Sequence, residues 1–302
     1  MLLRESKKLT INHNFGTIKD MTTQQNCLNK SCASFWILTK YYRLEQQLAI
    51  NLDRYELAHS IEAIYKFLWD FYADWYIEYL KSDETQLDFA KSLFRQFIVT
   101  ASPYCPFETE VLWREYFGET ELLASTTKDF GWTAKMFDVM FGAGTFEQDS
   151  RYVEFENTIE FIGNIRSLKG LFAIDPAVFV QVYSNSNTLS KYSDYIKSLG
   201  KCEIISQAKT EFYEVITGIG TNQIKYQIDI LQYIKDKPTE ILRTNKTIID
   251  LTKQIFQLET QLSNSKFIEN ADSFVILEKK NSLFIRQNEL NTQNIKLTFL
   301  NK

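Results

Sequence analysis

The apolar residues between positions 56 and 81 recur at every third or fourth position, and this spacing limits the possible folds more than any other feature. Six of them would share one side of a helix: Ile61, Ile64, Leu68, Tyr72, Trp75 and Tyr79. We expect this side to face a core. Asp53 is a candidate N-cap, and Lys81 suits the last turn. With 10 Gly and 4 Pro in 302 residues, the composition is typical of a folded, mainly helical chain.

Two further helices are predicted before residue 118. The same spacing continues in Leu87, Ala90, Phe94, Phe97 and Ala101. That helix must end before Pro103, and Pro106 can occupy the first turn of the next one. The first 117 residues therefore predict a helical bundle. Residues 118–150 contain scattered glycines, and we interpret them as a connector.

The pattern changes twice after residue 150. A helix is expected over 155–168 with Gly170 as its C-cap, and short β-branched or aromatic runs then predict strands at 177–183, 203–205, 212–217 and 223–228. Farther on, apolar residues repeat by three and four or by seven: Ile248, Leu251, Ile255, Leu258, Leu262, Ile276, Leu283, Leu290 and Leu297. Because residues 263–265 interrupt this repeat, we expect two helices folded as an antiparallel hairpin.

The expected fold class is mainly α, in four parts. Residues 1–23 form an irregular N-terminal segment, and residues 24–150 form the helical bundle with its connector. Residues 151–235 form a small α+β module, and residues 236–302 form a coiled-coil arm.

Composition and charge exclude several classes of protein. No apolar stretch is long enough to span a bilayer, and residues 1–8 lack the apolar core of a secretory signal, so we expect a cytoplasmic protein. Cysteines 27, 32, 105 and 202 are too sparse for a disulfide framework and are interpreted as free thiols. The chain has 34 basic and 38 acidic residues, but residues 221–302 carry 12 basic against 9 acidic. The C-terminal part is therefore the basic end.

Residues that usually carry catalysis are scarce. The two histidines are His13 and His59, and no Cys and His set has the spacing of a zinc site. The glycine pairs at 142–144 and 218–220 do not continue into a nucleotide-binding loop. Asp70, Asp74 and Glu78 are most simply a solvated helix face. We therefore expect no metal and no cofactor in this chain.

One short stretch interleaves basic and aromatic side chains: Phe35, Trp36, Lys40, Tyr41 and Arg43. Such a combination can stack on and neutralise single-stranded RNA. The same aromatic rings could instead belong to the core of the bundle. The sequence leaves both roles open.

Four segments resemble parts of a known family. Residues 65–78, Y-K-F-L-W-D-F-Y-A-D-W-Y-I-E, are similar to the Y-x-F-x-W-x-x-x-x-D-W-Y-[IL]-E signature in the anticodon-binding bundle of valyl-, isoleucyl- and leucyl-type class I aminoacyl-tRNA synthetases. Residues 103–113, P-Y-C-P-F-E-T-E-V-L-W, resemble the P-F-x-P-F-x-T-E-E-L-W segment of that bundle. Residues 165–169, I-R-S-L-K, resemble the I-R-x-[LI]-[RK] of the following helix. Residues 262–271, L-S-N-S-K-F-I-E-N-A, resemble the hairpin of the C-terminal coiled-coil arm of the valyl-tRNA synthetases.

The sequence also departs from that family. His-Ile-Gly-His and Lys-Met-Ser-Lys-Ser, which serve valine activation in the family, do not occur in these 302 residues. Residues 29–35 are a degenerate version of N-K-L-W-N-A-S-R-F, and Ser102 replaces the usual His before the first proline of the second segment. The resemblance, over about residues 24–298, thus concerns the tRNA-binding half and not the catalytic domain.

The resemblance implies that the chain binds valine tRNA as part of a valine–tRNA ligase, either as one piece of a split enzyme or as an incomplete chain. ATP and Mg²⁺ would then bind a catalytic domain that is supplied elsewhere. In a split enzyme this domain would be a separate chain and a partner of this one. Neither DNA nor a membrane is an expected partner. From residue type and position, the candidate tRNA-binding residues are Lys30, Phe35, Trp36, Lys40, Tyr41, Arg43, Lys253, Lys266, Lys279, Lys280 and Arg286. Each lysine of the arm could instead lie on a solvated helix face.

Two alternatives remain. The first is a structural or interaction protein that kept this fold and lost RNA binding. Residues 1–220 carry 22 basic and 29 acidic side chains, and this net negative charge favours that alternative. The second is an autonomous ligase, which the missing catalytic motifs disfavour.

Overall fold

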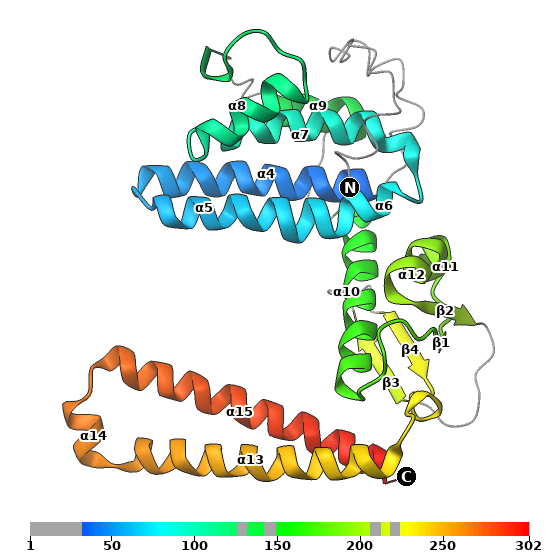
Figure 1. The fold of residues 1–302 in the computed structure, drawn as a ribbon, viewed down its shortest axis with the longest axis vertical. Helices are drawn as coiled ribbons and strands as arrows, with labels where there is room; N and C mark the ends of the chain where they lie inside the picture. The colour runs from blue at the N-terminus through cyan, green and yellow to red at the C-terminus, as the bar shows by residue number, and fades with distance from the viewer. Residues whose placement is uncertain (1–31, 126–131, 142–148, 206–212, 218–223, 302) are drawn as a thin grey trace. The chain divides into compact units, whose positions relative to one another are not determined.

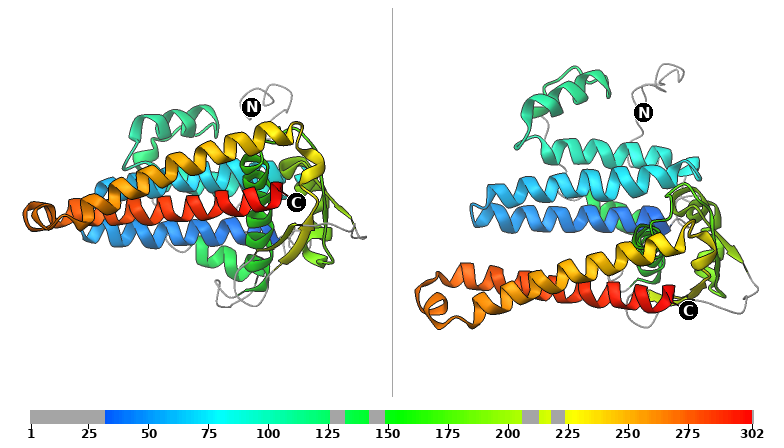
Figure 2. Two further views of the ribbon diagram at one scale, coloured as in Figure 1. Left: turned by 90° about the horizontal axis from the view of Figure 1, so that it is seen from below. Right: turned by 60° about the horizontal axis from the view of Figure 1, so that its bottom comes forward.

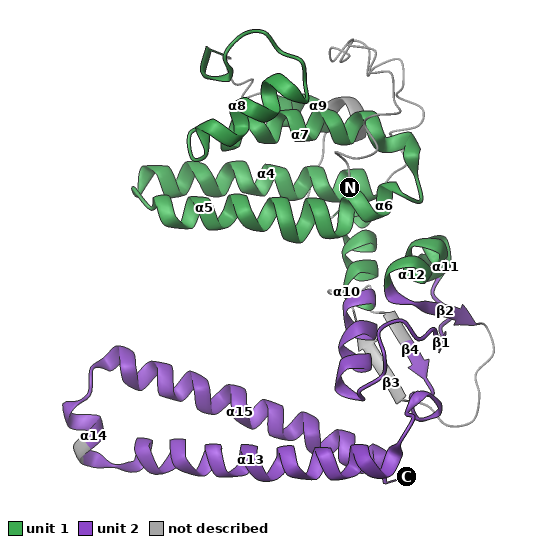
Figure 3. Ribbon diagram, viewed as in Figure 1, with its two compact units in different colours: residues 1–161, 187–199, 217–224 green, residues 162–186, 200–216, 225–302 purple. Residues whose placement is uncertain are grey.

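The computed structural model describes residues 32–125, 132–141, 149–205, 213–217 and 224–301. These residues are mainly helical, as expected, and form two compact units (Figures 1 and 3). Unit 1 comprises residues 1–161, 187–199 and 217–224. Unit 2 comprises residues 162–186, 200–216 and 225–302.

Unit 1 is a helical bundle. Its longer helices are α4 (Cys32–Asp53), α5 (Leu57–Lys66), α7 (Leu87–Ala101), α8 (Pro106–Glu115), α9 (Trp132–Phe141) and the first half of α10 (Ser150–Leu171). The segment η1 (Phe67–Ile77) continues α5, and the shorter helical segments are α6 (Glu78–Leu80), η2 (Glu84–Gln86), η3 (Leu123–Ser125), α11 (Asn187–Lys191) and α12 (Ser193–Gly200). Figure 1 shows α4, α5 and α7 running side by side. The bounds of α7 and the start of α8 at Pro106 confirm the sequence prediction.

The helix expected from residue 56 to residue 81 is continuous but not uniform. Its middle part, η1, is a π-helix, whose wider turn moves the inward-facing positions off the three-and-four spacing. As a result Phe67 and Tyr76 are buried, in addition to the expected Ile64 and Tyr72. The prediction for Ile61 is wrong, because α5 packs through Ser60 and Ile64 and leaves Ile61 exposed.

Three other local predictions are corrected. Asp53 is the last residue of α4 and not an N-cap, because the chain turns at Tyr55, which has a φ of 58°. The connector expected over residues 118–150 contains α9, which contributes buried Met136 and Phe137. Helix α10 continues past Gly170 to Leu171, and the left-handed residue after it is Ala173, with a φ of 52°.

Unit 2 begins with the second half of α10 and a small sheet. Its strands are β1 (Val180–Tyr183), β2 (Cys202–Ile205), β3 (Tyr213–Thr217) and β4 (Ile224–Ile228), in the order β2-β1-β4-β3. Strand β1 pairs in parallel with β2, with Val180 opposite Cys202, and antiparallel to β4, with Val182 opposite Ile228. A 3₁₀ turn, η5 (Leu231–Tyr233), then leads to the arm. These strands confirm the small α+β module.

A buried lysine joins the parts of this module. The Lys169 ammonium, near the end of α10, donates hydrogen bonds to the carbonyls of Val178 at 2.8 Å, Gly200 at 2.9 Å and Lys201 at 3.0 Å. Burial lowers the pKa of Lys169, since desolvation disfavours its charged form. These hydrogen bonds, with a longer one of 3.5 Å to the Pro176 carbonyl, offset part of that cost, and the lysine fixes the segments next to β1 and β2.

The arm is the expected antiparallel hairpin. It consists of α13 (Lys237–Ser263), the short α14 (Ser265–Asn270) and α15 (Ser273–Leu300), and α13 and α15 lie side by side (Figure 2). Asp236 accepts from the Thr239 amide at 3.1 Å and caps α13, and Asp272 accepts from the Phe274 amide at 2.7 Å and caps α15. Among the described residues, no helix combines the length and apolar character needed to cross a membrane.

Candidate nucleic-acid interface

The aromatic candidates near the start of α4 lie in the core of unit 1. Phe35, Trp36 and Tyr41 are at most 2% exposed. Their rings contact those of other helices: Phe35 lies 5.6 Å from Phe137, Trp36 lies 5.3 Å from Phe155, and Tyr41 lies 5.5 Å from Phe67. Of the two roles left open by the sequence, these rings have the core role, and in this structure no base could stack on them.

The neighbouring cations, Lys40 and Arg43, also make contacts inside the bundle. Lys40 lies 3.1 Å from a carboxylate oxygen of Glu156 on α10, which also accepts a hydrogen bond from Trp36. Burial lowers the pKa of Lys40, although Glu156 opposes this effect. Arg43 donates to the Tyr152 hydroxyl at 2.8 Å and lies 4.8 Å from that ring. Lys40 and Arg43 therefore hold α4 against α10, whereas Lys30 lies outside the described residues.

Four aromatic side chains among the described residues of unit 1 are more than half exposed, namely Tyr55, Tyr65, Trp69 and Phe107, and two of them are neighbours. Tyr65 in α5 and Trp69 in η1 are 61% and 51% exposed, and their ring centroids are 6.2 Å apart. The sequence analysis quoted both within the signature of residues 65–78 but did not select them as tRNA-binding candidates, because they lie one position beside the predicted apolar side of the helix. An aromatic ring must be exposed to solvent for a base to stack on it, and these two neighbouring rings meet that condition.

The basic candidates in the arm face different directions. Lys253 on α13 and Lys280 on α15 are exposed. Lys279 and Arg286 are half-buried on the side of α15 that carries Leu283, and Arg286 donates to Glu289 at 2.7 Å. Lys266 belongs to α14, but its side chain is outside the described residues.

The arm has two apolar faces on α13. Leu251 and Ile255 are buried on the expected seam with α15. Leu242, Ile249 and Phe256 are exposed and occur at intervals of seven residues. The sequence analysis missed this second face, although the seven-residue interval is visible in the sequence.

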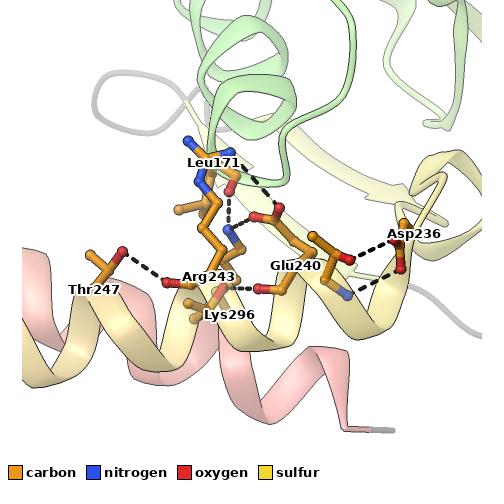
Figure 4. Close-up of polar contacts among 8 residues, drawn as sticks. Leu171, Asp236, Glu240, Arg243, Thr247 and Lys296 are labelled. Atoms are coloured by element: carbon orange, nitrogen blue, oxygen red, sulfur yellow. Dashed lines mark hydrogen bonds and ion pairs between the residues drawn. The ribbon is translucent and has the colours of Figure 1, made fainter.

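A buried ion pair lies at the base of the arm. Lys296 of α15 donates to the Glu240 carboxylate of α13 and to the Leu171 carbonyl at the end of α10 (Figure 4). The side chains of Lys296 and Glu240 are only 5% and 8% exposed. Arg243, exposed to solvent, lies 3.9 Å from Glu240. Three segments that are distant in the sequence are thereby joined at one point.

The described residues contain no group of side chains typical of a metal centre. No group of three His, Cys, Asp or Glu side chains among them could hold a metal ion. His59 is exposed, with Nδ1 3.4 Å from a carboxylate oxygen of Glu56. Cys32, Cys105 and Cys202 are free thiols, as predicted, while His13, Cys27 and both glycine pairs lie outside the described residues.

Comparison with known proteins supports the resemblance seen in the sequence. The valine–tRNA ligase of Campylobacter jejuni is 26% identical over 284 residues, which are 91% of this chain and 30% of that protein. The enzyme of Nitratiruptor sp. is 27% identical over 89% of this chain and 29% of its own length, and that of Thermotoga maritima is 24% identical over 82% and 28%. This chain thus spans less than a third of the length of these relatives. Residues 34–184, half of the chain, match the family described as the anticodon-binding domain of tRNA ligase. The chain belongs to this family of tRNA ligase anticodon-binding domains.

Proposed function

We propose that this chain is the tRNA-binding portion of a valine–tRNA ligase and contributes to valyl-tRNA aminoacylation in the cytoplasm. The observation that carries the proposal is the family match over residues 34–184, which covers most of the helical bundle of unit 1. The relatives that cover most of the chain are valine–tRNA ligases, which supports tRNA for valine as the partner.

In this proposal the bundle holds the anticodon stem and loop. Tyr65 and Trp69 have the exposed rings that stacking requires, and such stacking contributes about 1 to 3 kcal/mol per base. The exposed cations of the arm, Lys253 and Lys280, lie near phosphates of the same tRNA, together with Lys266. Phosphate contacts of this kind position the RNA and do not read its sequence.

We assign valine activation, with its ATP and Mg²⁺, to a catalytic domain outside these 302 residues. The assignment rests on the sequence, which contains neither His-Ile-Gly-His nor Lys-Met-Ser-Lys-Ser. A separate chain that supplies this domain is a proposed partner. Valine-dependent exchange of pyrophosphate into ATP by the purified chain alone would overturn this assignment.

The test is the affinity of the purified chain for a valine tRNA transcript at two salt concentrations. The same transcript with a scrambled anticodon is the control. We expect tighter binding of the unaltered transcript and weaker binding at higher salt, because phosphate contacts release counterions. Equal affinity for both transcripts, or no binding, would refute anticodon recognition.

The second candidate is a structural or interaction protein that retains the fold without binding RNA. The core role of Phe35, Trp36 and Tyr41 favours it, since these were the predicted stacking residues. Replacing Phe35 would not decide the matter, because a Phe to Ala change in a core costs about 3 to 5 kcal/mol and could unfold unit 1. The exposed Tyr65 and Trp69 are better targets: if Tyr65→Ala with Trp69→Ala leaves both the helical content and the tRNA affinity unchanged, the bundle does not recognise RNA through them.

A further inference from the structure

Helix α15 has two apolar faces. The inner face lies toward α13 and carries the half-buried Ile276, Leu283, Leu290 and Leu297. The outer face is formed by positions two residues before or one residue after these, which places it on the far side of the helix. Its residues, all exposed, are Phe274, Leu277, Asn281, Phe284, Asn288, Asn291 and Ile295. The side of a hairpin helix that faces away from its partner is normally polar, and this side carries two phenylalanines.

The outer face of α15 has the pattern of a coiled-coil seam. Its positions are separated by three and four residues in alternation, from residue 274 to residue 295. Phe274 and Phe284 are 72% and 65% exposed, and no charged residue occupies a position of the face. The three asparagines are of the kind that fixes the register of paired helices at some cost in stability. The pattern therefore indicates that a second helix packs on this side of α15.

The outer face of α13 differs in charge. It carries Leu242, Ile249 and Phe256, with the exposed Lys246 and Lys253 between them. If two copies met through this face, their lysines would be brought together, whereas the outer face of α15 is uncharged. An RNA would need cations to neutralise its phosphates, which the outer face of α15 does not provide. An occupant of the α15 face must therefore be apolar and uncharged itself.

We propose that the outer face of α15 is a dimerisation surface, on which α15 of a second copy of this chain packs in parallel and in register as a two-fold symmetric coiled coil. Each residue of the face then lies opposite its own counterpart, so that Phe284 meets Phe284 and Asn281 meets Asn281. All three asparagines are thereby paired with asparagine, and every apolar residue with an apolar one. An antiparallel pair that joins Leu277 to Ile295 would instead set Phe284 against Asn288.

The flanks of the face also suit a second copy. In the parallel pair, the residues beside the seam that approach each other are Lys280 with Ile285 and Ser273 with Glu278, so no like charges meet. The methylene groups of Lys280 can cover Ile285 while its ammonium stays in water. A shallow hollow at the edge of the face leaves room for a side chain of the opposing helix, and it is lined by Ile285, Asn288, Glu289, Thr292 and Gln293.

The area of the face is compatible with a reversible dimer. The exposed parts of Phe274 and Phe284 would bury about 200 to 350 Å² per copy, since an aromatic side chain buries about 150 to 250 Å² in full. A standard interface buries about 800 Å² per partner, so the two rings supply roughly a third of it. The remainder falls to the asparagines and to Leu277, Ile285 and Ile295, which are about half exposed.

The test is the mass of the purified chain in sedimentation equilibrium over a concentration series. The mass is expected to rise with concentration from 35.5 kDa toward twice that value. Phe284→Glu is expected to raise the Kd of the dimer by about a hundredfold or more, because a central aromatic side chain typically dominates an interface and the new charge occurs twice in the dimer. The matched control is Phe256→Glu, which places the same charge on the outer face of α13 at similar exposure and should leave the Kd unchanged.

The direction of the pair is tested by cross-linking. In the parallel pair Leu277 meets Leu277, so the Leu277→Cys variant should form a disulfide-linked dimer on mild oxidation, beyond any that the wild type forms. Cross-linking only in a mixture of Leu277→Cys and Ile295→Cys would show an antiparallel pair and overturn the proposed arrangement.

Other outcomes would refute the dimer altogether. They are a mass that stays at 35.5 kDa at every concentration, or a Phe284→Glu variant that associates like Phe256→Glu. If Phe284→Glu lowers the affinity for the valine tRNA transcript and leaves the mass unchanged, the face contacts RNA and the inference is wrong. The inference does not rest on tRNA binding, so its failure would leave the proposed function standing.

Discussion

Replacing Lys296 by methionine is expected to destabilise unit 2, because it leaves the Glu240 carboxylate buried without its main cationic partner. Both side chains are almost fully removed from solvent, at 5% and 8% exposure. Removing one member of a buried ion pair typically costs about 3 to 5 kcal/mol. The Leu171 carbonyl also loses the hydrogen bond from Lys296, which adds about 1 kcal/mol.

Arg243 limits this loss only slightly. Its guanidinium lies 3.9 Å from Glu240 and its side chain is 68% exposed, so we assign its ion pair at most about 1 kcal/mol. A net loss of about 3 to 5 kcal/mol in the free energy of unfolding is therefore expected for Lys296→Met. For a domain of this size that corresponds to a decrease of roughly 10 to 20 °C in the melting temperature of unit 2.

The distribution of tryptophan gives this experiment an internal control. All five tryptophans, at positions 36, 69, 75, 113 and 132, belong to unit 1. Urea unfolding followed by circular dichroism at 222 nm reports both units, whereas tryptophan fluorescence reports unit 1. Lys296→Met should lower the urea midpoint for unfolding of unit 2, seen by circular dichroism. It should leave the urea midpoint of the fluorescence change, which reports unit 1, unaltered.

A second variant separates charge from packing. In Lys296→Met with Glu240→Met no charge remains buried, and replacing a buried ion pair by apolar residues is often neutral. We expect the double variant to recover most of the stability lost in Lys296→Met. A loss below about 1 kcal/mol in the single variant, or a double variant no more stable than the single one, would show that solvent reaches the pair and that the reasoning is wrong.

Three further predictions follow from described contacts. Burial raises the pKa of the Cys202 thiol to about 12. In the unfolded chain this thiol loses its proton from about pH 9, whereas in the folded chain it retains the proton up to about pH 12. The free energy of unfolding should therefore fall as the pH rises from 9 to 12. Urea titrations of the wild type and Cys202→Ala check this, because the variant should show a smaller fall, and Cys202 should resist alkylation at pH 8 until the chain unfolds. Lys169→Met leaves four carbonyls without this donor, three of them in hydrogen bonds of 3.0 Å or less, and should cost about 3 kcal/mol in urea unfolding of unit 2. A loss of less than about 0.5 kcal/mol, roughly that of a surface change, would contradict the assigned role. Trp69→Ala should weaken anticodon stem-loop binding about tenfold in a fluorescence-anisotropy titration with helical content unchanged, and an unaltered affinity would remove this ring from the interface.

The sequence predicted most of the helices because their signals are local. Pro103 and Pro106 delimit α7 and α8, and the heptad of leucines in α15 predicts a hairpin partner. It placed the start of α5 within one residue but wrongly took Asp53 as the N-cap, because the turn at Tyr55 depends on a left-handed conformation that few non-glycine residues adopt. The exposure of Ile61 likewise depends on which side of α5 packs in the bundle, and spacing alone does not select between adjacent sides.

The candidate site was less predictable, since it depends on contacts between distant segments. Lys40 and Trp36 meet Glu156, more than 100 residues farther along the chain, and nothing near residue 40 indicates this partner. Interleaved aromatic and basic residues look the same in sequence whether the rings point inward or outward. The outer face of α13 could have been found from the seven-residue interval of Leu242, Ile249 and Phe256, but an interval alone does not establish exposure.

The ion pair at the base of the hairpin also has a mechanical consequence. Helix α13 has 27 residues and is therefore about 40 Å long, and the ion pair of Glu240 and Lys296 lies in its first turn, about 35 Å from Ser263. A change of about 10° in the direction of the hairpin at that ion pair would move its far end by roughly 6 Å. A substitution at the base can thus shift what the tip touches without altering any residue at the tip.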